Sequence, residues 1–279
     1  MQIQDNIKEI VKQALMEDVG DGDHSSLSCI SGNIIGRMKL LAKENGILAG
    51  VEVAKEVIRQ VDETITMEVF IHDGEAIKVG DVVFELFGPA RSMLTAERTL
   101  LNFMQRLSGV ATASRRYADA VAGTTTTILD TRKTTPGMRF LEKYAVKMGG
   151  CENHRFGLFD MIMLKDNHID FAGGIENAIL ATHNYLKEKD LNLKIEVETR
   201  NIEEIKQVMK VGGIHRIMLD NFTPERIKEA LAVIERRYET EASGGITMQN
   251  LREYALTGVD YISIGALTHQ IKSLDLSLK

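Results

Sequence analysis

The sequence predicts an α/β protein in two parts, a mixed α+β part followed by a barrel of repeated βα units. The first hundred residues contain short β-branched segments separated by tight turns. After about residue 110, helices alternate with short apolar strands. Four strand ends in this second part, at Glu198, Asp220, Ser243 and Gly265, follow one another at intervals of 22, 23 and 22 residues. Repeats of that length, with polar residues at the carboxyl ends of strands, are typical of a TIM-type barrel.

Two helices frame the first part. Apolar residues recur at helical spacing over residues 3–15, and Gly20 ends the pattern. A longer amphipathic helix starts near Ser92, and we expect Gly109 to end or bend it. Taken alone, Arg98 in this helix is most simply a solvated surface arginine.

Between these helices, residues 36–50 and 64–89 are predicted to form strands, with a helix over 50–61. The strands are joined by tight turns at Asn45-Gly46, Asp73-Gly74 and Gly80-Asp81. Residues 73–86 would also suit a small carrier domain of the biotinyl or lipoyl type. Such a carrier needs a modifiable lysine between two apolar residues at a hairpin tip, and the sequence has none there.

The second part contains six short strands, most of which close on a polar residue: TILDT, MIMLK, KIEVE, RIMLD, TEAS and YISIG. A doubly wound open sheet is the main alternative to a barrel. That fold would carry one glycine-rich G-x-G-x-x-G fingerprint near its first strand, and the sequence contains none.

Composition excludes several classes of function. The net charge of -6 argues against a nucleic-acid or anionic-membrane partner, because nothing would attract a polyanion over long range. Only Cys29 and Cys151 are present, without a CxxC pair or a His/Cys cluster, so neither a disulfide framework nor a structural zinc site is supported. The acidic first residues and the lack of a long apolar run predict a soluble cytoplasmic protein.

The segment 130–167 has the composition of an anion site. It places these cationic side chains among glycines and short turns: Arg132, Lys133, His154, Arg155 and Lys165. Acidic residues are interleaved with them, which would weaken any grip on nucleic acid. A compact anion with several oxygens therefore fits better than a polyphosphate backbone.

Other residues at strand ends suit the same chemistry. Ser243-Gly244-Gly245 and Gly265-Ala266 each lie between a strand and a helix, where free backbone N–H groups favour a phosphate. Glu198 and Asp220 could pair with lysines, stabilise positive charge on a sugar carbon, hold ribose hydroxyls or bind hydrated Mg²⁺. Lys165 could be a Schiff-base nucleophile or a fixed charge, and its position alone does not decide.

Several motifs, in order, give a specific resemblance: EDVGDGD, LTAERTLLNFMQRLSGVAT, DTRKTTPGMRFLEKYAVKMGG, NHRFGLFDMIMLKDNHI, IEVE, LDNF, SGG and IGALTH. Together they closely resemble the quinolinate phosphoribosyltransferase family over nearly the whole chain. The resemblance implies an α/β sandwich domain over 1–108, to which the C-terminal residues can return, and an incomplete seven-stranded TIM-like barrel over 109–279. It also implies transfer of phosphoribose from phosphoribosyl pyrophosphate to quinolinate with Mg²⁺. Pyrophosphate and carbon dioxide are released, and nicotinate mononucleotide for NAD synthesis is left.

The same resemblance implies roles for individual residues. Arg132, His154, Arg155 and Lys165 correspond to positions that hold the quinolinate carboxylates, and Arg98 to an arginine donated by the partner subunit of a homodimer, which can build into a hexamer. Lys133 corresponds to a lysine near the pyrophosphate, and Thr131 precedes it in the same substrate-binding segment. Glu198 and Asp220 correspond to the ribose and metal carboxylates, and with Lys133 they are the expected catalytic residues. Phosphate loops are implied at Ser243, Gly244, Gly245, Ile264, Gly265 and Ala266.

The chain departs from the family pattern at Cys151, where many relatives have a third glycine, and in HSSLSC, where an Ile-Thr pair is common. Neither position carries a proposed charge contact. Two other readings stay open: a Schiff-base aldolase using Lys165, and a related phosphoribosyltransferase with another acceptor or a homologue linked to metal transport.

Overall fold

The structure, a computed structural model, describes residues 3–279. Its contacts divide the chain into two compact units. The first, which we call the sheet unit, contains residues 1–116, 133–151 and 266–279; the second, the barrel unit, contains residues 117–132 and 152–265. Among the described residues, no helix combines the length and the apolar composition needed to cross a membrane.

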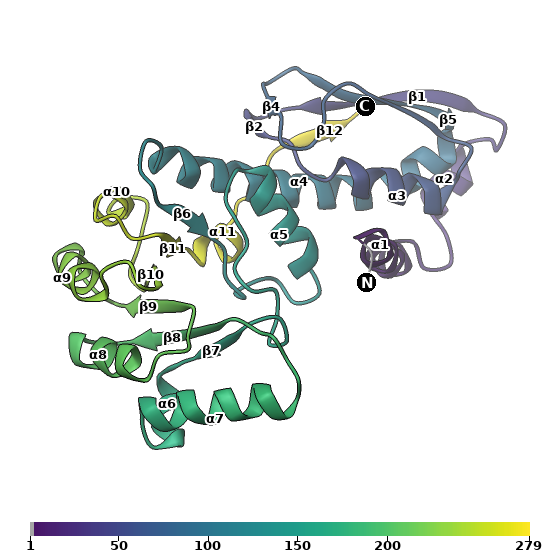
Figure 1. The fold of residues 1–279 in the computed structure, drawn as a ribbon. Helices are drawn as coiled ribbons and strands as arrows, with labels where there is room; N and C mark the ends of the chain where they lie inside the picture. Colours follow the sequence, from purple (N-terminus) through teal and green to yellow (C-terminus); the bar gives the residue numbers. More distant parts are fainter. Residues whose placement is uncertain (1–2) are drawn as a thin grey trace. The chain divides into compact units, whose positions relative to one another are not determined.

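The sheet unit is built on a four-stranded antiparallel sheet in the order β12-β1-β5-β3. Its strands are β1 (Ile35–Ala42), β3 (Thr66–Val69), β5 (Val82–Pro89) and β12 (Leu276–Leu278), and a second small sheet pairs β2 (Gly46–Ile47) with β4 (Ala76–Ile77). Helices α1 (Ile3–Val19), α2 (His24–Cys29), α3 (Val51–Val61), α4 (Ala90–Ala120), α5 (Arg139–Met148) and α11 (Ala266–His269) complete the labelled elements (Figure 1). The last strand of the chain thus pairs with the first strand, as the resemblance implied.

Helix α4 corrects one expectation. It does not end at Gly109 but continues to Ala120. A Cβ at position 109 would overlap the Lys272 carbonyl and approach the Ser273 backbone to 3.1 Å. Gly109 therefore allows the C-terminal segment to lie close against the helix. The expected boundary between residues 108 and 109 stays a prediction, and it falls inside this helix.

The barrel unit contains a six-stranded parallel sheet in the order β6-β11-β10-β9-β8-β7. The strands are β6 (Thr127–Leu129), β7 (Ile162–Leu164), β8 (Ile195–Thr199), β9 (Arg216–Asp220), β10 (Glu239–Ser243) and β11 (Tyr261–Ser263). The helices that follow them are α6 (Asp166–Ala172), α7 (Ile175–Glu188), α8 (Ile202–Val211), α9 (Pro224–Ile234) and α10 (Leu251–Ala255).

The strand order shows where the barrel is incomplete. The first strand, β6, pairs with the last, β11, but not with its sequence neighbour β7. On that open side, Glu152 forms a single parallel bridge with Leu129. The seventh strand expected from the resemblance is thus reduced to one bridge, and the α/β barrel is otherwise confirmed.

Alternation along the barrel strands places apolar and charged residues on opposite faces. In β8, Ile195 and Val197 are buried on one face, while Glu196 and Glu198 lie on the other. The interiors of such barrels are usually filled by Val, Ile and Leu. Here Glu196 and Glu241 of β10 are both fully buried. Burying these charges reduces the stability of the fold unless their partners compensate, so we expect a function on this face.

Candidate active site

The residues expected to bind substrate follow the carboxyl ends of all six barrel strands. Because the strands are parallel, these ends lie on one edge of the sheet. The residues are Thr131 and Arg132 after β6, Lys165 after β7, Glu198 in β8, Asp220 in β9, Ser243, Gly244 and Gly245 at the end of β10, and Ile264 and Gly265 after β11. Of the other five, His154 and Arg155 belong to the barrel unit, and Arg98, Lys133 and Ala266 belong to the sheet unit.

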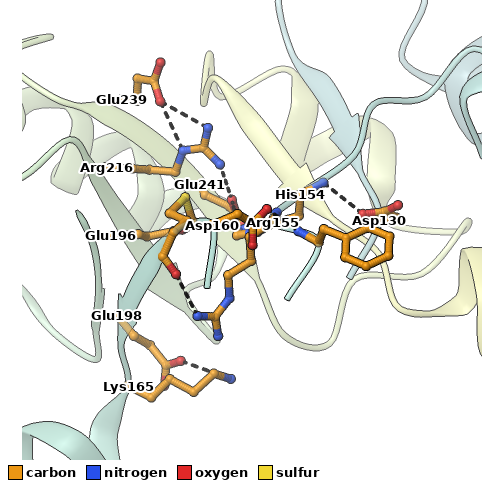
Figure 2. A network of polar contacts seen from close by, with 12 residues as sticks. Asp130, His154, Arg155, Asp160, Lys165, Glu196, Glu198, Arg216, Glu239 and Glu241 are labelled. Carbon is orange, nitrogen blue, oxygen red and sulfur yellow. Dashed lines mark hydrogen bonds and ion pairs between the residues drawn. The ribbon is translucent and has the colours of Figure 1, made fainter. Parts of the chain in front are cut away.

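Lys165 and Glu198 form an ion pair at this edge. Lys165 Nζ lies 3.8 Å from Glu198 Oε2, and the two side chains are 50% and 10% exposed (Figure 2). The pair therefore combines a reachable ammonium with a nearly buried carboxylate. A lysine held this way is available as a fixed positive charge for an anion.

Glu198 and Asp220 have the properties of a cation site. Burial and then the charge of Asp220 raise the pKa of Glu198, while Lys165 lowers it. A bound cation stabilises the charged form of a carboxylate that lies near another carboxylate, and oxygen donors are those that Mg²⁺ prefers. The residues present thus fit a hydrated Mg²⁺.

The turns after β9 and β10 are interlocked. The Asn221 N–H donates to the Ser243 carbonyl at 2.8 Å, and Asn221 Nδ2 donates to Asp220 Oδ2 at 2.7 Å. Gly244 has φ +89, and a Cβ there would overlap Asn221 Oδ1. Gly245 also has a positive φ, of +66, with open space around it. A glycine is therefore needed at position 244 both for its backbone conformation and for space.

Arg132 has an unsatisfied donor. Its Nε is buried and has no hydrogen-bond partner among the described residues. Leaving a buried donor unpaired costs about 1–3 kcal/mol, and more when the group is charged. An anion placed against the guanidinium would remove that cost.

Arg155 is close to Arg132. Burial and then the charge of Arg132 lower the pKa of Arg155, while Glu196 and Asp160 oppose the shift. Arg155 Nη1 donates to the Met161 carbonyl at 3.1 Å, and Figure 2 shows the guanidinium between Glu196 and the Lys165–Glu198 pair. Two guanidinium groups that repel one another again favour an anion between them.

The ring of His154 is turned to the barrel interior. Its Nε2 lies 3.0 Å from Glu196 Oε2 and 3.2 Å from Glu241 Oε2, and its Nδ1 accepts the N–H of Arg155 at 2.7 Å. The backbone N–H of His154 donates to Asp130 Oδ1 at 2.8 Å. Both ring nitrogens thus face protein atoms, so the structure does not favour the expected contact between this ring and a substrate carboxylate.

His154, Glu196, Arg216 and Glu241 form what we call the interior charge cluster (Figure 2). Arg216 Nη1 lies 2.8 Å from Glu241 Oε2, and its Nη2 lies 3.1 Å from Glu239 Oε2. The ligand atoms of His154, Glu196 and Glu241 lie within 4.8 Å of one another, which is a spacing that could hold a metal ion. Arg216 already supplies positive charge to Glu241.

Protonation in the cluster follows from its hydrogen bonds. Burial and then the charge of Glu241 raise the pKa of Glu196 to about 7. Burial would lower the pKa of His154, but the two carboxylates outweigh it and raise this pKa to about 9. A second proton on the ring would nevertheless have to displace the Arg155 N–H from Nδ1. In this structure the ring therefore carries its proton on Nε2.

The buried members of the cluster were not among the residues expected from the sequence. Glu196, Arg216 and Glu241 lie two or four residues before strand-end residues that were expected. In a strand, residues two apart share a face. The alternation in IEVE, RIMLD and ETEAS therefore contained the signal.

In the sheet unit, a buried ion pair supports the segment that carries Lys133. Glu142 is fully buried and accepts Arg106 Nη2 at 2.7 Å, the Thr135 N–H at 3.0 Å and the Thr135 hydroxyl at 2.8 Å. Arg106 Nη2 also donates to the Thr268 carbonyl at 2.7 Å, and the Thr268 hydroxyl donates to the Lys133 carbonyl at 2.7 Å. The segment after Lys133 and the helix that begins at Ala266 are thus held by one pair.

Arg98 lies on the exposed face of α4. Leu94, one helical turn earlier, is 37% exposed although it is a large apolar residue. Within the described chain, this face of α4 therefore combines an apolar side chain with a cation.

Comparison with known proteins identifies the family. Residues 23–108 match the model of the quinolinate phosphoribosyl transferase N-terminal domain, and residues 110–279 match that of its C-terminal domain. The chain belongs to the quinolinate phosphoribosyltransferase family.

Relatives match over nearly the whole chain. A chloroplastic, carboxylating nicotinate-nucleotide pyrophosphorylase from rice is 43% identical over 98% of this chain and 77% of its own length. A probable carboxylating nicotinate-nucleotide pyrophosphorylase from Bacillus subtilis is 41% identical over 98% of this chain and 92% of its own. The structure of the nicotinate-nucleotide pyrophosphorylase from Francisella tularensis superposes with a TM-score of 0.90 at 39% identity, covering 99% of this chain and 96% of that one.

Proposed function

We propose that this chain transfers phosphoribose from phosphoribosyl pyrophosphate to the ring nitrogen of quinolinate, with decarboxylation. The products are nicotinate mononucleotide, pyrophosphate and carbon dioxide, and the reaction serves NAD biosynthesis. The names of the rice and Bacillus subtilis relatives support this reaction. The observation that carries it in the structure is the buried, unpartnered Nε of Arg132 beside Arg155, because two such groups suit the adjacent carboxylates of a pyridine diacid.

The assignment of residues follows from this chemistry. Quinolinate carboxylates are bound by Arg132, Arg155 and Lys165, and the partner subunit adds Arg98. Phosphate groups are bound by Lys133 in the segment that begins at Thr131, and by the loops Ser243–Gly245 and 264–266. Helix N-termini and free backbone N–H groups at such loops favour phosphate.

Glu198 and Asp220 have two tasks in this proposal. They would hold Mg²⁺ through water, and they stabilise the positive charge that develops on the ribose carbon as pyrophosphate leaves. When bound, Mg²⁺ neutralises the charge of the departing pyrophosphate. Lys133 provides a further cation for that leaving group.

Decarboxylation follows from glycosylation. Once the pyridine nitrogen has formed its bond to the ribose carbon, the ring is cationic and accepts the electron pair released when the adjacent carboxylate leaves as carbon dioxide. A proton then replaces the carboxylate on the ring. The enzyme therefore needs mainly to hold two anionic substrates in reacting geometry.

Assembly as a homodimer, which can build into a hexamer, is part of the proposal. Exposed Leu94 beside Arg98 supports a subunit interface on this face of α4. We also propose a cytoplasmic location, although plant relatives carry chloroplastic or mitochondrial in their names.

One experiment tests the reaction. The protein is incubated with phosphoribosyl pyrophosphate and Mg²⁺, and with either quinolinate labelled in its 2-carboxylate or nicotinate. We expect labelled carbon dioxide and nicotinate mononucleotide from quinolinate and no product from nicotinate. Product from nicotinate alone would favour a related phosphoribosyltransferase. Borohydride trapping of a keto substrate on Lys165 would favour an aldolase.

A further inference from the structure

The interior charge cluster is an expensive arrangement that the proposed reaction does not by itself require. The side chains of His154, Glu196, Arg216 and Glu241 are 5%, 0%, 12% and 0% exposed. Removing a charged group from water costs several kcal/mol per ion unless its partners compensate. Apolar residues would fill the same space at lower cost. The cluster is therefore expected to have a role other than filling the barrel interior.

The cluster depends on His154. Neither carboxylate oxygen of Glu196 has a hydrogen-bond partner with good geometry among the described residues, and His154 Nε2 lies 3.0 Å from its Oε2. Glu241 has a second partner, Arg216. Arg216 is itself fixed by Glu239 and by the Tyr261 ring, whose centroid lies 3.9 Å from its Cζ. Arg216 thus supports Glu241, and Glu241 and Glu196 each face the imidazole.

The imidazole in turn holds the backbone of Arg155. An imidazole has two ring nitrogens. One faces the two carboxylates, and the other accepts the N–H of Arg155 at 2.7 Å. Neither nitrogen is directed to solvent, since the ring is almost completely buried. Any effect of His154 on a substrate must pass through the residue it holds.

Arg155 is a residue whose placement matters. Its guanidinium lies near that of Arg132, and the two positive charges repel each other. Among the described residues, this guanidinium is anchored by one hydrogen bond, which Arg155 Nη1 donates to the Met161 carbonyl at 3.1 Å. A guanidinium in this situation would move away from its neighbour if its backbone were free to rotate. A hydrogen bond that fixes the Arg155 backbone therefore also limits where the guanidinium can lie.

We propose that the interior charge cluster is a positioning device for Arg155. Glu196 and Glu241 hold the His154 ring, and the ring fixes the backbone of Arg155 so that its guanidinium stays beside Arg132 at the carboxyl edge of the barrel. His154, Glu196 and Glu241 are positioning residues that act through Arg155. The inference rests on the proposed function, because it takes the ligand of Arg155 to be a carboxylate of quinolinate.

A double-mutant cycle tests this. Glu196→Gln and His154→Asn are made singly and in an Arg155→Ala background, and the KM values for quinolinate and for phosphoribosyl pyrophosphate are measured. Each single change should raise the KM for quinolinate roughly tenfold and leave the other KM within about twofold. In the Arg155→Ala background, each should have little further effect on the KM for quinolinate. His154→Asn provides the test if Glu196→Gln does not fold, since asparagine has no counterpart of the Nε2 that faces Glu196 and Glu241 and so cannot be held by them.

Asp260→Asn is the matched control. Asp260 lies in the same barrel unit and accepts the Thr240 N–H at 2.8 Å and hydroxyl at 2.6 Å, but it is not part of the cluster. It should leave both KM values unchanged. The inference would be overturned if the effect of either cluster change on the KM for quinolinate were as large in the Arg155→Ala background as in the wild type. It would also be overturned if both KM values rose equally. Either outcome would leave the wild-type reaction intact. If wild-type protein instead releases no carbon dioxide from quinolinate, the proposed function itself fails.

Discussion

The Asn221 N–H donates to the Ser243 carbonyl at 2.8 Å, which ties the turn after β9 to the loop after β10. The loop can approach this closely because position 244 is glycine. Two site segments that are about twenty residues apart in sequence are therefore positioned by one another.

This relationship predicts different effects at two adjacent glycines. Both Gly244 and Gly245 have positive φ, so alanine at either is strained by about 1–2 kcal/mol. Only at position 244 would the added Cβ also overlap Asn221. Gly244→Ala should lower kcat/KM for phosphoribosyl pyrophosphate by roughly 100-fold and Gly245→Ala by roughly tenfold or less. Equal losses, measured in steady-state kinetics, would show that the contact with Asn221 is unimportant.

The buried pair of Arg106 and Glu142 gives a prediction about stability. Removing one partner of a buried ion pair costs about 3–5 kcal/mol, because the other charge is left uncompensated. Glu142→Gln should therefore lower the free energy of unfolding by about 3 kcal/mol in urea titrations. It should also raise the KM for phosphoribosyl pyrophosphate, since Thr135 and Lys133 lose their support. Glu52→Gln, in the exposed pair with Lys55, is the control and should change neither quantity measurably.

Much of the barrel could be predicted because its signal is local and periodic. The regular spacing of Glu198, Asp220 and Ser243 placed these residues at strand ends, and the structure has them there. The pairing of β12 with β1 could not be obtained from such spacing, since it joins residues more than 230 positions apart. The resemblance to known relatives supplied that part.

One expectation was wrong for a clear physical reason, and another stays a prediction. Gly109 was expected to end or bend a helix because glycine is a poor helix former, but here its lack of a side chain makes room for the segment at Lys272. The resemblance assigned His154 to a substrate carboxylate, and this stays a prediction. The buried carboxylates of Glu196 and Glu241, far away in sequence, compete for that ring.

Asp62 gives a prediction about pH. The hydroxyls of Thr64 and Ser92 and the Thr64 N–H donate to its carboxylate and lower its pKa below the ordinary 3.8. A carboxyl group whose folded-state pKa is lowered stabilises the fold above its ordinary pKa, and this contribution is lost as the pH falls through the folded-state value. Asp62→Asn should therefore be less stable than wild type at pH 7, and the difference should shrink below about pH 4. A constant difference across urea titrations from pH 7 to pH 3 would contradict this.

Substitutions at Arg132 separate the contribution of its charge from that of its planar shape. Its guanidinium can bind a planar carboxylate through two N–H groups, which a lysine ammonium cannot. Arg132→Lys should thus lose most of the activity lost by Arg132→Ala, with kcat/KM for quinolinate reduced by roughly 10- to 100-fold in the lysine variant. Melting temperatures near that of wild type would show that the fold is kept. Near wild-type kinetics in Arg132→Lys would mean that charge alone is sufficient.

The proposed role of Arg98 predicts that two inactive variants restore activity when their subunits are mixed. If Arg98 completes the site of the partner, Arg98→Ala and Lys165→Ala chains are each inactive alone, but a mixed dimer contains one intact site. That site has its own Lys165 and receives Arg98 from the other chain. With random mixing, about half of the dimers are mixed and about a quarter of wild-type activity should return.

The control for this experiment mixes Arg132→Ala with Lys165→Ala chains. Both residues belong to the same barrel unit, so every site in the mixture lacks one of them, and no activity should return. Size-exclusion chromatography establishes that each variant assembles as wild type does. Failure of the first mixture to recover activity, although mixed dimers are present, would place Arg98 in the site of its own chain or outside any site. Recovery in the control mixture would instead mean that the barrel edge is itself shared between subunits, because Arg132 and Lys165 could then be supplied by different chains.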